Sequence, residues 1–215
     1  MADPEKPKRQ YRSSRRQEQA KETRGRILAA GLKLFSKHGY AGATMEAIAE
    51  EAGVALLTVY ATFGNKRSIL ADLISVSVSG DDQPIPLLQR TGPQSVLEEK
   101  DPFRQIHLFA VDITEILKRV APVFEIMRMA AKTEPEIAEM LVNILGKRLR
   151  NLGVFVQTLA ANTDLRDGLD VPGATETVWT IASPEVYRLL TVDRGWTKER
   201  FAQWLGDSLT RLLLP

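Results

Sequence analysis

The sequence predicts an all-α protein, with a three-helix helix-turn-helix domain at its N-terminal end and a helical bundle behind it. Apolar residues recur every three or four positions along most of the 215 residues, which is the spacing of one face of a helix. Ser, Thr, Asp or Asn precede several of these segments, as helix N-caps do. Strand-like alternation of apolar and polar residues is not sustained over any length.

The first amphipathic helix is expected over residues 24–40. Ile27, Leu28, Leu34 and Phe35 share one apolar face, and Gly39 is the stop signal. The next segment, from Thr44 to Lys66, reads as two short helices and the start of a third. Thr44 is a suitable N-cap, Ile48, Ala49 and Ala52 form one apolar face, and Gly53 suits the left-handed residue after a helix end. Two short helices joined by such a turn form a helix-turn-helix.

Residues Ile27 to Leu70, ILAAGLKLFSKHGYAGATMEAIAEEAGVALLTVYATFGNKRSIL, resemble the tetracycline-repressor (TetR) family of bacterial transcriptional regulators. The resemblance implies a homodimer that binds a double-stranded DNA operator through its N-terminal domains. It also implies a C-terminal domain that dimerises as a four-helix bundle and binds a small-molecule effector. We therefore expect a disordered basic arm over 1–16, a DNA-binding domain over 17–79, and an effector-binding and dimerisation domain over 80–215.

Charge is distributed unevenly along the chain. Residues 1–75 hold 13 Lys and Arg against 8 Asp and Glu, a net of +5, whereas the remaining 16 and 19 give −3. This asymmetry suggests that a polyanion meets the front half only. The arm is either a solvated tail or a segment that reaches phosphates or the minor groove, and the attached DNA-binding unit favours the second interpretation.

The segment expected to read DNA, residues 55–63, has no Arg, Lys, Asn or Gln for bidentate base contacts. Ala55 stands where the family commonly has Ser, so a helix cap is lost. Thymine methyls and DNA shape then have to supply the discrimination, unless Leu56 and Leu57 pack on the preceding helix. The position of Lys66 usually touches phosphate in the family. The predicted DNA-binding residues are Thr44, Leu56, Leu57, Thr58, Tyr60, Ala61, Thr62, Lys66, Arg12, Arg15 and Arg16.

Behind the boundary, Gly80 and three following prolines predict a loop. A long helix is expected from Pro102 until Pro122 ends it, and Thr133 with Glu136 reads as a capping box for a helix over 134–160. The first of these helices carries Phe103, His107, Ala110 and Thr114 on one face. We expect His107 to be the polar anchor of an apolar effector pocket. The alternative is that the same residues fill a solid core. The predicted ligand-binding residues are Phe103, His107, Ala110, Thr114, Phe124, Met127, Phe155 and Trp179.

Two apolar helices end the chain, and caps at Ser183 and Thr197 begin them. They either close the subunit's own core or pair with a second copy, and half-site reading by helix-turn-helix proteins favours pairing. The predicted dimerisation residues are Val186, Tyr187, Leu190, Phe201, Trp204, Leu205, Leu209 and Leu212.

Other function classes lack their signatures. The two histidines have no metal-ligand spacing, no phosphate-binding glycine loop or GxSxG occurs, and cysteine is absent. A charged N-terminus and the lack of about 18 consecutive apolar residues argue against secretion or a membrane span. We therefore expect a cytoplasmic, ligand-responsive repressor without enzymatic activity, metal or cofactor. The alternative is a helical small-molecule-binding enzyme or carrier that uses the same cavity.

Overall fold

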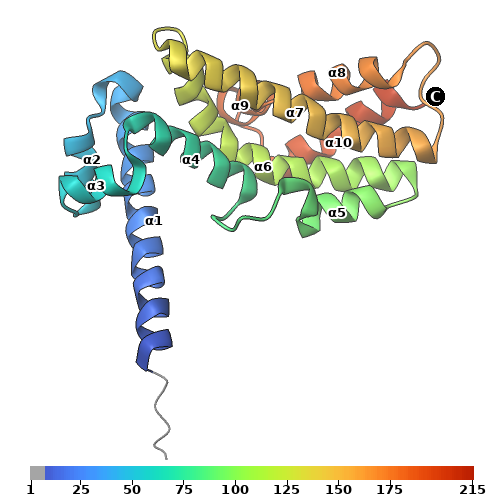
Figure 1. Cartoon of the computed structure of the whole chain (residues 1–215). Helices are drawn as coiled ribbons and strands as arrows, with labels where there is room; N and C mark the ends of the chain where they lie inside the picture. Colours follow the sequence, from blue (N-terminus) through green and yellow to red (C-terminus); the bar gives the residue numbers. More distant parts are fainter. Residues whose placement is uncertain (1–7) are drawn as a thin grey trace, which may run out of the picture. The chain divides into compact units, whose positions relative to one another are not determined.

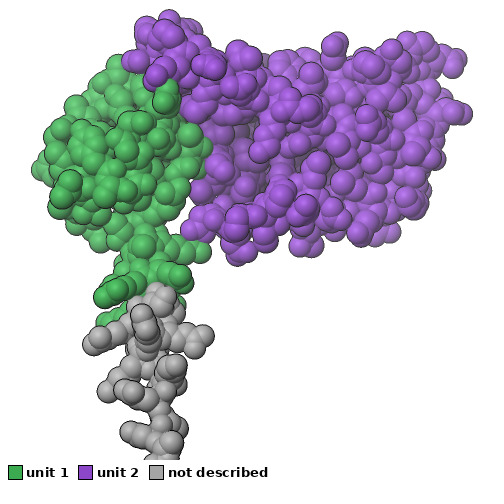
Figure 2. Space-filling view, viewed as in Figure 1, with its two compact units in different colours: residues 1–73 green, residues 74–215 purple. Residues whose placement is uncertain are grey.

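The computed structural model describes residues 8–215, all of whose regular elements are helical, so the all-α prediction is confirmed. The chain divides into two compact units, residues 1–73 and 74–215 (Figures 1 and 2). The predicted boundary, at 79/80, lies six residues later, at the end of helix α4 (Lys66–Ser79) rather than within it.

Unit 1 consists of α1 (Lys8–Gly42), α2 (Met45–Ala52), α3 (Leu56–Phe63) and the first part of α4. Non-helical angles at Gly39 (φ 71°) interrupt α1 three residues before its end. Gly31 allows α1 and α4 to approach closely, because a Cβ there would lie 2.8 Å from Ile69 Cγ2. The side chains that fill this small core are Ile27, Phe35, Ile48, Val59 and Ile69.

The N-terminal part of α1 differs from the expected disordered arm. Residues 8–16 are helical, and residues 1–7 lie outside the described part of the chain. From Lys8 to Arg24 the chain has neither Gly nor Pro and consists largely of Lys, Arg, Gln, Glu and Ala. These are good helix formers, and their propensity extends the helix beyond the apolar stripe on which the prediction relied.

Unit 2 is a helical bundle built around α6 (Pro102–Ala130). The most extensive packing is between α6 and α10 (Lys198–Leu213), and α5 (Thr91–Glu98), α7 (Pro135–Asn162) and α9 (Pro184–Arg188) also pack on α6. Helix α8 (Val171–Ile181) packs on α7, and two short turns, η1 (Leu87–Gln89) and η2 (Leu189–Asp193), complete the unit. The predicted caps are present at Ser183 and Thr197, whose hydroxyls accept from Val186 N and Arg200 N.

Two predicted features of this unit are wrong. Helix α6 continues through Pro122 instead of ending there. Val120, Ala121, Val123 and Phe124 around it are buried, and this packing outweighs the hydrogen bond that proline cannot donate. The Thr133–Glu136 capping box does not form, because α7 begins at Pro135 and the Thr133 hydroxyl donates to the Ala130 carbonyl at 3.4 Å instead.

Asp112 on α6 carries a pH-dependent contribution to stability. Burial raises the pKa of this carboxyl, and the nearby Arg119 only partly opposes the shift. A carboxyl with a raised folded-state pKa stabilises the fold below its unfolded pKa and loses that contribution as the pH rises through the folded value. We therefore expect Asp112→Asn to unfold at higher denaturant concentration than wild type at pH 7. The difference disappears towards pH 3.8, the ordinary value of the group.

Urea titrations at several pH values test this expectation, with Asp167→Asn, an exposed carboxylate in the loop before α8, as the matched control. A constant difference between Asp112→Asn and wild type from pH 7 to pH 4 would mean that the carboxyl does not titrate differently on folding.

Candidate nucleic-acid interface

The corner between α2 and α3 has the geometry of a helix-turn-helix. The Thr44 hydroxyl accepts from Ala47 N at 3.1 Å and begins α2, as predicted. Gly53 ends α2 in the left-handed conformation (φ 62°, ψ 42°) and donates to Glu50 O at 3.0 Å, while Val54 N donates to Ala49 O at 3.0 Å. The turn is therefore closed by backbone hydrogen bonds that only a residue tolerant of positive φ permits.

Helix α3 turns one face inward and leaves the other free within unit 1. Val59 and Phe63 are buried, whereas Leu57 is 79% exposed, Tyr60 43% and Leu56 36%. Ala61 is also exposed. The alternative that Leu57 packs on the preceding helix does not hold in unit 1. Leu56, Leu57, Tyr60 and Ala61 are exposed together at helical spacing, and an apolar face of this kind indicates a contact surface.

The two threonines of α3 are less available than the leucines. Thr58 and Thr62 are half-buried. The Thr62 hydroxyl donates to the Thr58 carbonyl at 2.7 Å, so its proton is used within the helix and its oxygen can only accept a further bond. The free face of α3 is consequently apolar, apart from the tyrosine hydroxyl.

Lys66 is engaged inside unit 1, although the family resemblance assigns it to a phosphate. Its ammonium donates to the Tyr40 carbonyl at 2.6 Å and to the Ala43 carbonyl at 3.0 Å, and it lies 4.4 Å from the centre of the Tyr40 ring. These contacts join the end of α1 to the start of α4. The predicted N-cap at Asn65 is present, since its Oδ1 accepts from Ser68 N at 2.9 Å.

Arg26 on α1 contributes a contact that the sequence did not indicate. Its guanidinium donates to the Ala52 carbonyl, at 3.1 Å from Nε, and to the Gly53 carbonyl at 2.7 Å. These are carbonyls at the end of α2 that the helix itself leaves unpaired. Arg26 thus fixes the turn that orients α3. The sequence indicated that the end of α2 has carbonyls in need of hydrogen-bond donors. Nothing in the residue spacing indicated that Arg26 would supply them.

Other charges of unit 1 form ion pairs or are exposed. Lys33 pairs with Glu51 at 2.6 Å, and Arg24 pairs with Asp72 while lying 4.8 Å from the centre of the Phe63 ring. Arg15 and Arg16 are exposed on α1. The side chain of Arg12 lies outside the described part of the structure, although its backbone belongs to α1.

Ala55 begins α3 without a side-chain hydrogen bond, as the sequence predicted. Its backbone angles (φ −65°, ψ 143°) are those of an N-cap, so a serine there fits without rearrangement. We expect Ala55→Ser to raise the free energy of unfolding by about 1 kcal/mol. Thermal or urea unfolding measures the change, with Ala61→Ser on the same helix as the control. Equal effects from the two variants would exclude capping as the cause.

The predicted effector residues differ in how far the structure buries them. Phe103 is 56% exposed and His107 is exposed, whereas Ala110 and Thr114 further along the same face are buried. A Cβ on Gly206 of α10 would lie 2.6 Å from His107 Nδ1, so α10 covers one side of this imidazole. The others fill cores or line their edges: Phe124 and Met127 are buried, Phe155 stacks on Phe109 with ring centres 4.0 Å apart, and Trp179 is half-buried.

The predicted dimer residues also lie mostly inside unit 2. Four are buried in its core, where they pack with α6, and this is the alternative that the sequence left open. Helix α10 is apolar because α6 covers it. The four buried residues are Tyr187, Phe201, Leu205 and Leu209. Val186, Leu190 and Trp204 are half-buried against that core, and Leu212 is exposed.

Neither a metal site nor a membrane span is found in the part of the chain that the structure describes. No group of three or more His, Cys, Asp or Glu side chains there is placed to hold a metal ion. No helix within residues 8–215 is both long and apolar enough to cross a membrane.

Comparisons with known proteins agree with this geometry. Residues 27–73 match the model of the family described as bacterial regulatory proteins, tetR family. A curated relative, the HTH-type transcriptional repressor KstR of Rhodococcus jostii (strain RHA1), is 29% identical over 159 residues, which are 74% of this chain and 70% of KstR.

Solved structures share the fold of most of the chain at low identity. The transcriptional regulator FadR from Bacillus subtilis, solved with stearoyl-CoA, is 20% identical with a TM-score of 0.68, over 86% of this chain and 96% of FadR. The SmeT–triclosan complex is 20% identical with a TM-score of 0.69, over 90% of this chain and 92% of SmeT.

Proposed function

The chain belongs, through residues 27–73, to the tetR family of bacterial regulatory proteins, and from this premise we propose that it is a homodimeric repressor that a small molecule releases from its operator. The observation that carries the proposal is the free apolar face of α3, presented by a turn of helix-turn-helix geometry. KstR, the relative at 29% identity, is named a transcriptional repressor. A DNA partner places the protein in the cytoplasm.

In the proposed complex, helix α3 contacts the bases, and other residues of unit 1 contact the phosphates. Helix α3 enters the major groove, where Leu57 and Ala61 meet thymine methyls, the apolar feature of that groove. Thr44 at the start of α2 and Tyr60 on α3 hydrogen-bond to phosphates. Arg15 and Arg16, exposed on α1, add positive charge along the DNA backbone. Because the reading face has no bidentate donor, thymine methyls and DNA shape supply the specificity.

Two copies are needed for tight binding, because one short α3 reads only a half-site. The effector then acts on the geometry of the pair. It changes the distance between the two α3 helices, which no longer fit successive major grooves. FadR and SmeT, which share the fold, were solved with stearoyl-CoA and triclosan, and each of these ligands has an apolar part. The effector proposed for this chain is accordingly one with a substantial apolar part.

The test is titration of the purified protein into labelled duplexes from the DNA beside its own gene, followed by fluorescence anisotropy. We expect one duplex to bind two chains, with an affinity that falls steeply between about 50 and 200 mM salt. Footprinting of that duplex defines the half-sites. Failure to bind any of these duplexes more tightly than random DNA would overturn the proposal and favour the enzyme or carrier alternative.

A further inference from the structure

Unit 2 contains a cavity of about 390 Å³ between the end of α4, the following loop, the start of α5 and the middle of α6. None of the residues predicted to bind an effector lines it. Its wall combines apolar side chains from all sides, Val78, Ile85, Leu87 and Ile116, with charged groups from the loop and from α6. The cavity is open to solvent on one side, so a ligand can enter without unfolding of the bundle.

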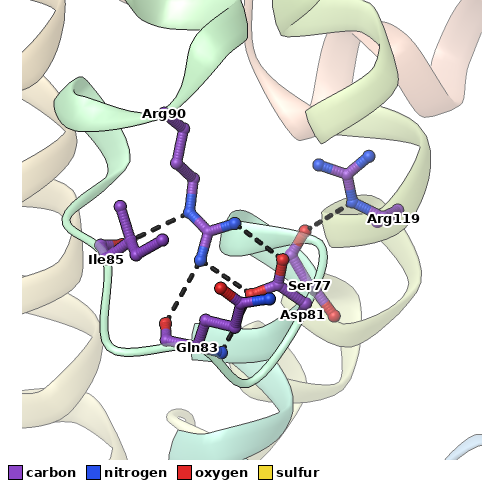
Figure 3. Close-up of polar contacts among 6 residues, drawn as sticks. All are labelled: Ser77, Asp81, Gln83, Ile85, Arg90 and Arg119. Atoms are coloured by element: carbon purple, nitrogen blue, oxygen red, sulfur yellow. Dashed lines mark hydrogen bonds and ion pairs between the residues drawn. The ribbon is translucent and has the colours of Figure 1, made fainter.

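The loop side of the cavity is held in place by Arg90 (Figure 3). Its guanidinium forms a bidentate pair with Asp81, at 2.9 and 2.8 Å, and also donates to the carbonyls of Ile85 and Gln83 at 3.2 Å. With these four bonds Arg90 is largely satisfied by its own loop, and Asp81 raises its pKa. Arg90 therefore shapes the wall and has little left to offer a ligand.

Arg119 on α6 is the cation with donors to spare. Its Nε donates to the Ser77 carbonyl at 3.0 Å, and its guanidinium lies against Gly80, where a Cβ would be 3.5 Å away (Figure 3). No hydrogen bond within residues 15–215 uses its two terminal nitrogens. A guanidinium oriented through Nε, with both terminal nitrogens available, matches the two oxygens of a carboxylate.

Asp112, one turn before Ile116 on α6, faces the start of α5. A Cβ on Gly92 would lie 2.0 Å from its Oδ1, so the carboxyl packs directly on the glycine backbone. Asp112 and Arg119 form no direct ion pair among the described side chains, although both line the cavity. Burial disfavours the charged form of Asp112 and raises its pKa, while the nearby Arg119 partly opposes the shift.

We propose that this cavity binds a small amphipathic carboxylate, whose head group is held by the terminal nitrogens of Arg119 and whose apolar part lies on Val78, Ile85, Leu87 and Ile116. The two terminal nitrogens of Arg119 are available to a ligand, whereas the Asp112 carboxyl packs on the Gly92 backbone, and this difference favours an anion over a cation. A wall that combines apolar side chains with charged groups suits a ligand that has both an apolar part and a charged head group.

Binding of the carboxylate to this cavity does not depend on the proposed DNA-binding function. Regulation of DNA binding by that ligand does rest on the proposed function. The ligand contacts Val78 and Ser79, at the end of the helix that leads out of unit 1. Calorimetry on the full chain without DNA tests binding alone. Anisotropy of an operator complex with and without the ligand tests regulation, so failure of the two ideas can be told apart.

The calorimetric probes are octanoate, octylamine and 1-octanol, which share a chain and differ in charge. We expect octanoate to bind and the other two to bind at least tenfold more weakly. Arg119→Gln should weaken octanoate at least tenfold, Arg119→Lys less, and Lys118→Gln, the exposed neighbour that does not line the cavity, not at all. Asp112→Asn, which keeps the size of the side chain, should preserve or strengthen binding.

Equal binding of octanoate and 1-octanol, or an equal loss in Arg119→Gln and Lys118→Gln, would overturn the assignment. The absence of octanoate binding at millimolar concentration would do so as well. Arg119→Gln also removes the bond to Ser77, so its thermal unfolding is measured alongside. If Arg119→Gln unfolds at a lower temperature than wild type, the octanoate affinity of Asp112→Asn is compared with that of wild type instead. Weaker octanoate binding by Asp112→Asn would contradict an anion site.

Discussion

Replacing Leu57 with glutamate should lower operator affinity by at least roughly 30-fold, which corresponds to about 2 kcal/mol in total, or about 1 kcal/mol for each of the two half-sites that lose an apolar contact. Leu57 is the most exposed residue of the α3 face, so the new carboxylate lies where the phosphates and base edges of DNA approach. The fold should be unaffected, because a glutamate in the first turn of a helix is favourable. Anisotropy titrations on one duplex at fixed salt measure the change.

The control is Val142→Glu on α7, a comparably exposed apolar residue (67%, against 79% for Leu57) of unit 2 that receives the same charge. It changes the net charge of the chain by the same amount, so it corrects for long-range repulsion from DNA. If both variants bind as wild type does, α3 is not the reading helix. If both lose affinity alike, the loss is a charge effect and not a loss of contact.

Lys66→Met should lower the free energy of unfolding by about 2 kcal/mol in the absence of DNA, since two charge-assisted hydrogen bonds to carbonyls are lost. Methionine keeps most of the aliphatic stem against Tyr40, so the loss reports the ammonium rather than packing. Urea unfolding measures it, with Lys37→Met at the exposed end of α1 as the control.

The same variant decides between two roles for this lysine. A lysine committed to the Tyr40 and Ala43 carbonyls changes stability and leaves the salt dependence of DNA binding nearly unchanged. A lysine that neutralises a phosphate reduces the slope of log affinity against log salt by about one per chain. An unchanged unfolding midpoint with a reduced slope would restore the phosphate role that the family resemblance implies.

Local chemistry made the helix-turn-helix predictable from the sequence. Thr44, Gly53 and Asn65 each act within a few residues of their own position, and a cap or a left-handed turn needs only the right residue type there. The missing cap at Ala55 was visible for the same reason. These features survive in the structure because tertiary packing has little to change at a helix end.

Long side chains and helix faces were harder to predict, because several tertiary partners compete for them. Lys66 and Arg26 reach carbonyls 23 to 27 residues away in the sequence, and periodicity carries no information on such contacts. The apolar stripe of α10 fits a neighbour in the same subunit as well as one in a second copy, and α6 takes it. The cavity beside Arg119 depends on a loop, whose path no helical pattern fixes.

The lack of a side-chain N-cap at the start of α3 also has a consequence for dynamics. Ala55 gives the first-turn amides of Leu56 and Leu57 no side-chain acceptor, so these protons face solvent in the free protein. They should exchange with deuterium much faster than the amides of Val59 and Phe63 one turn later, and DNA should slow them. The first turn of α3 then loses conformational freedom on binding, and association carries an entropy cost that a capped helix would not incur.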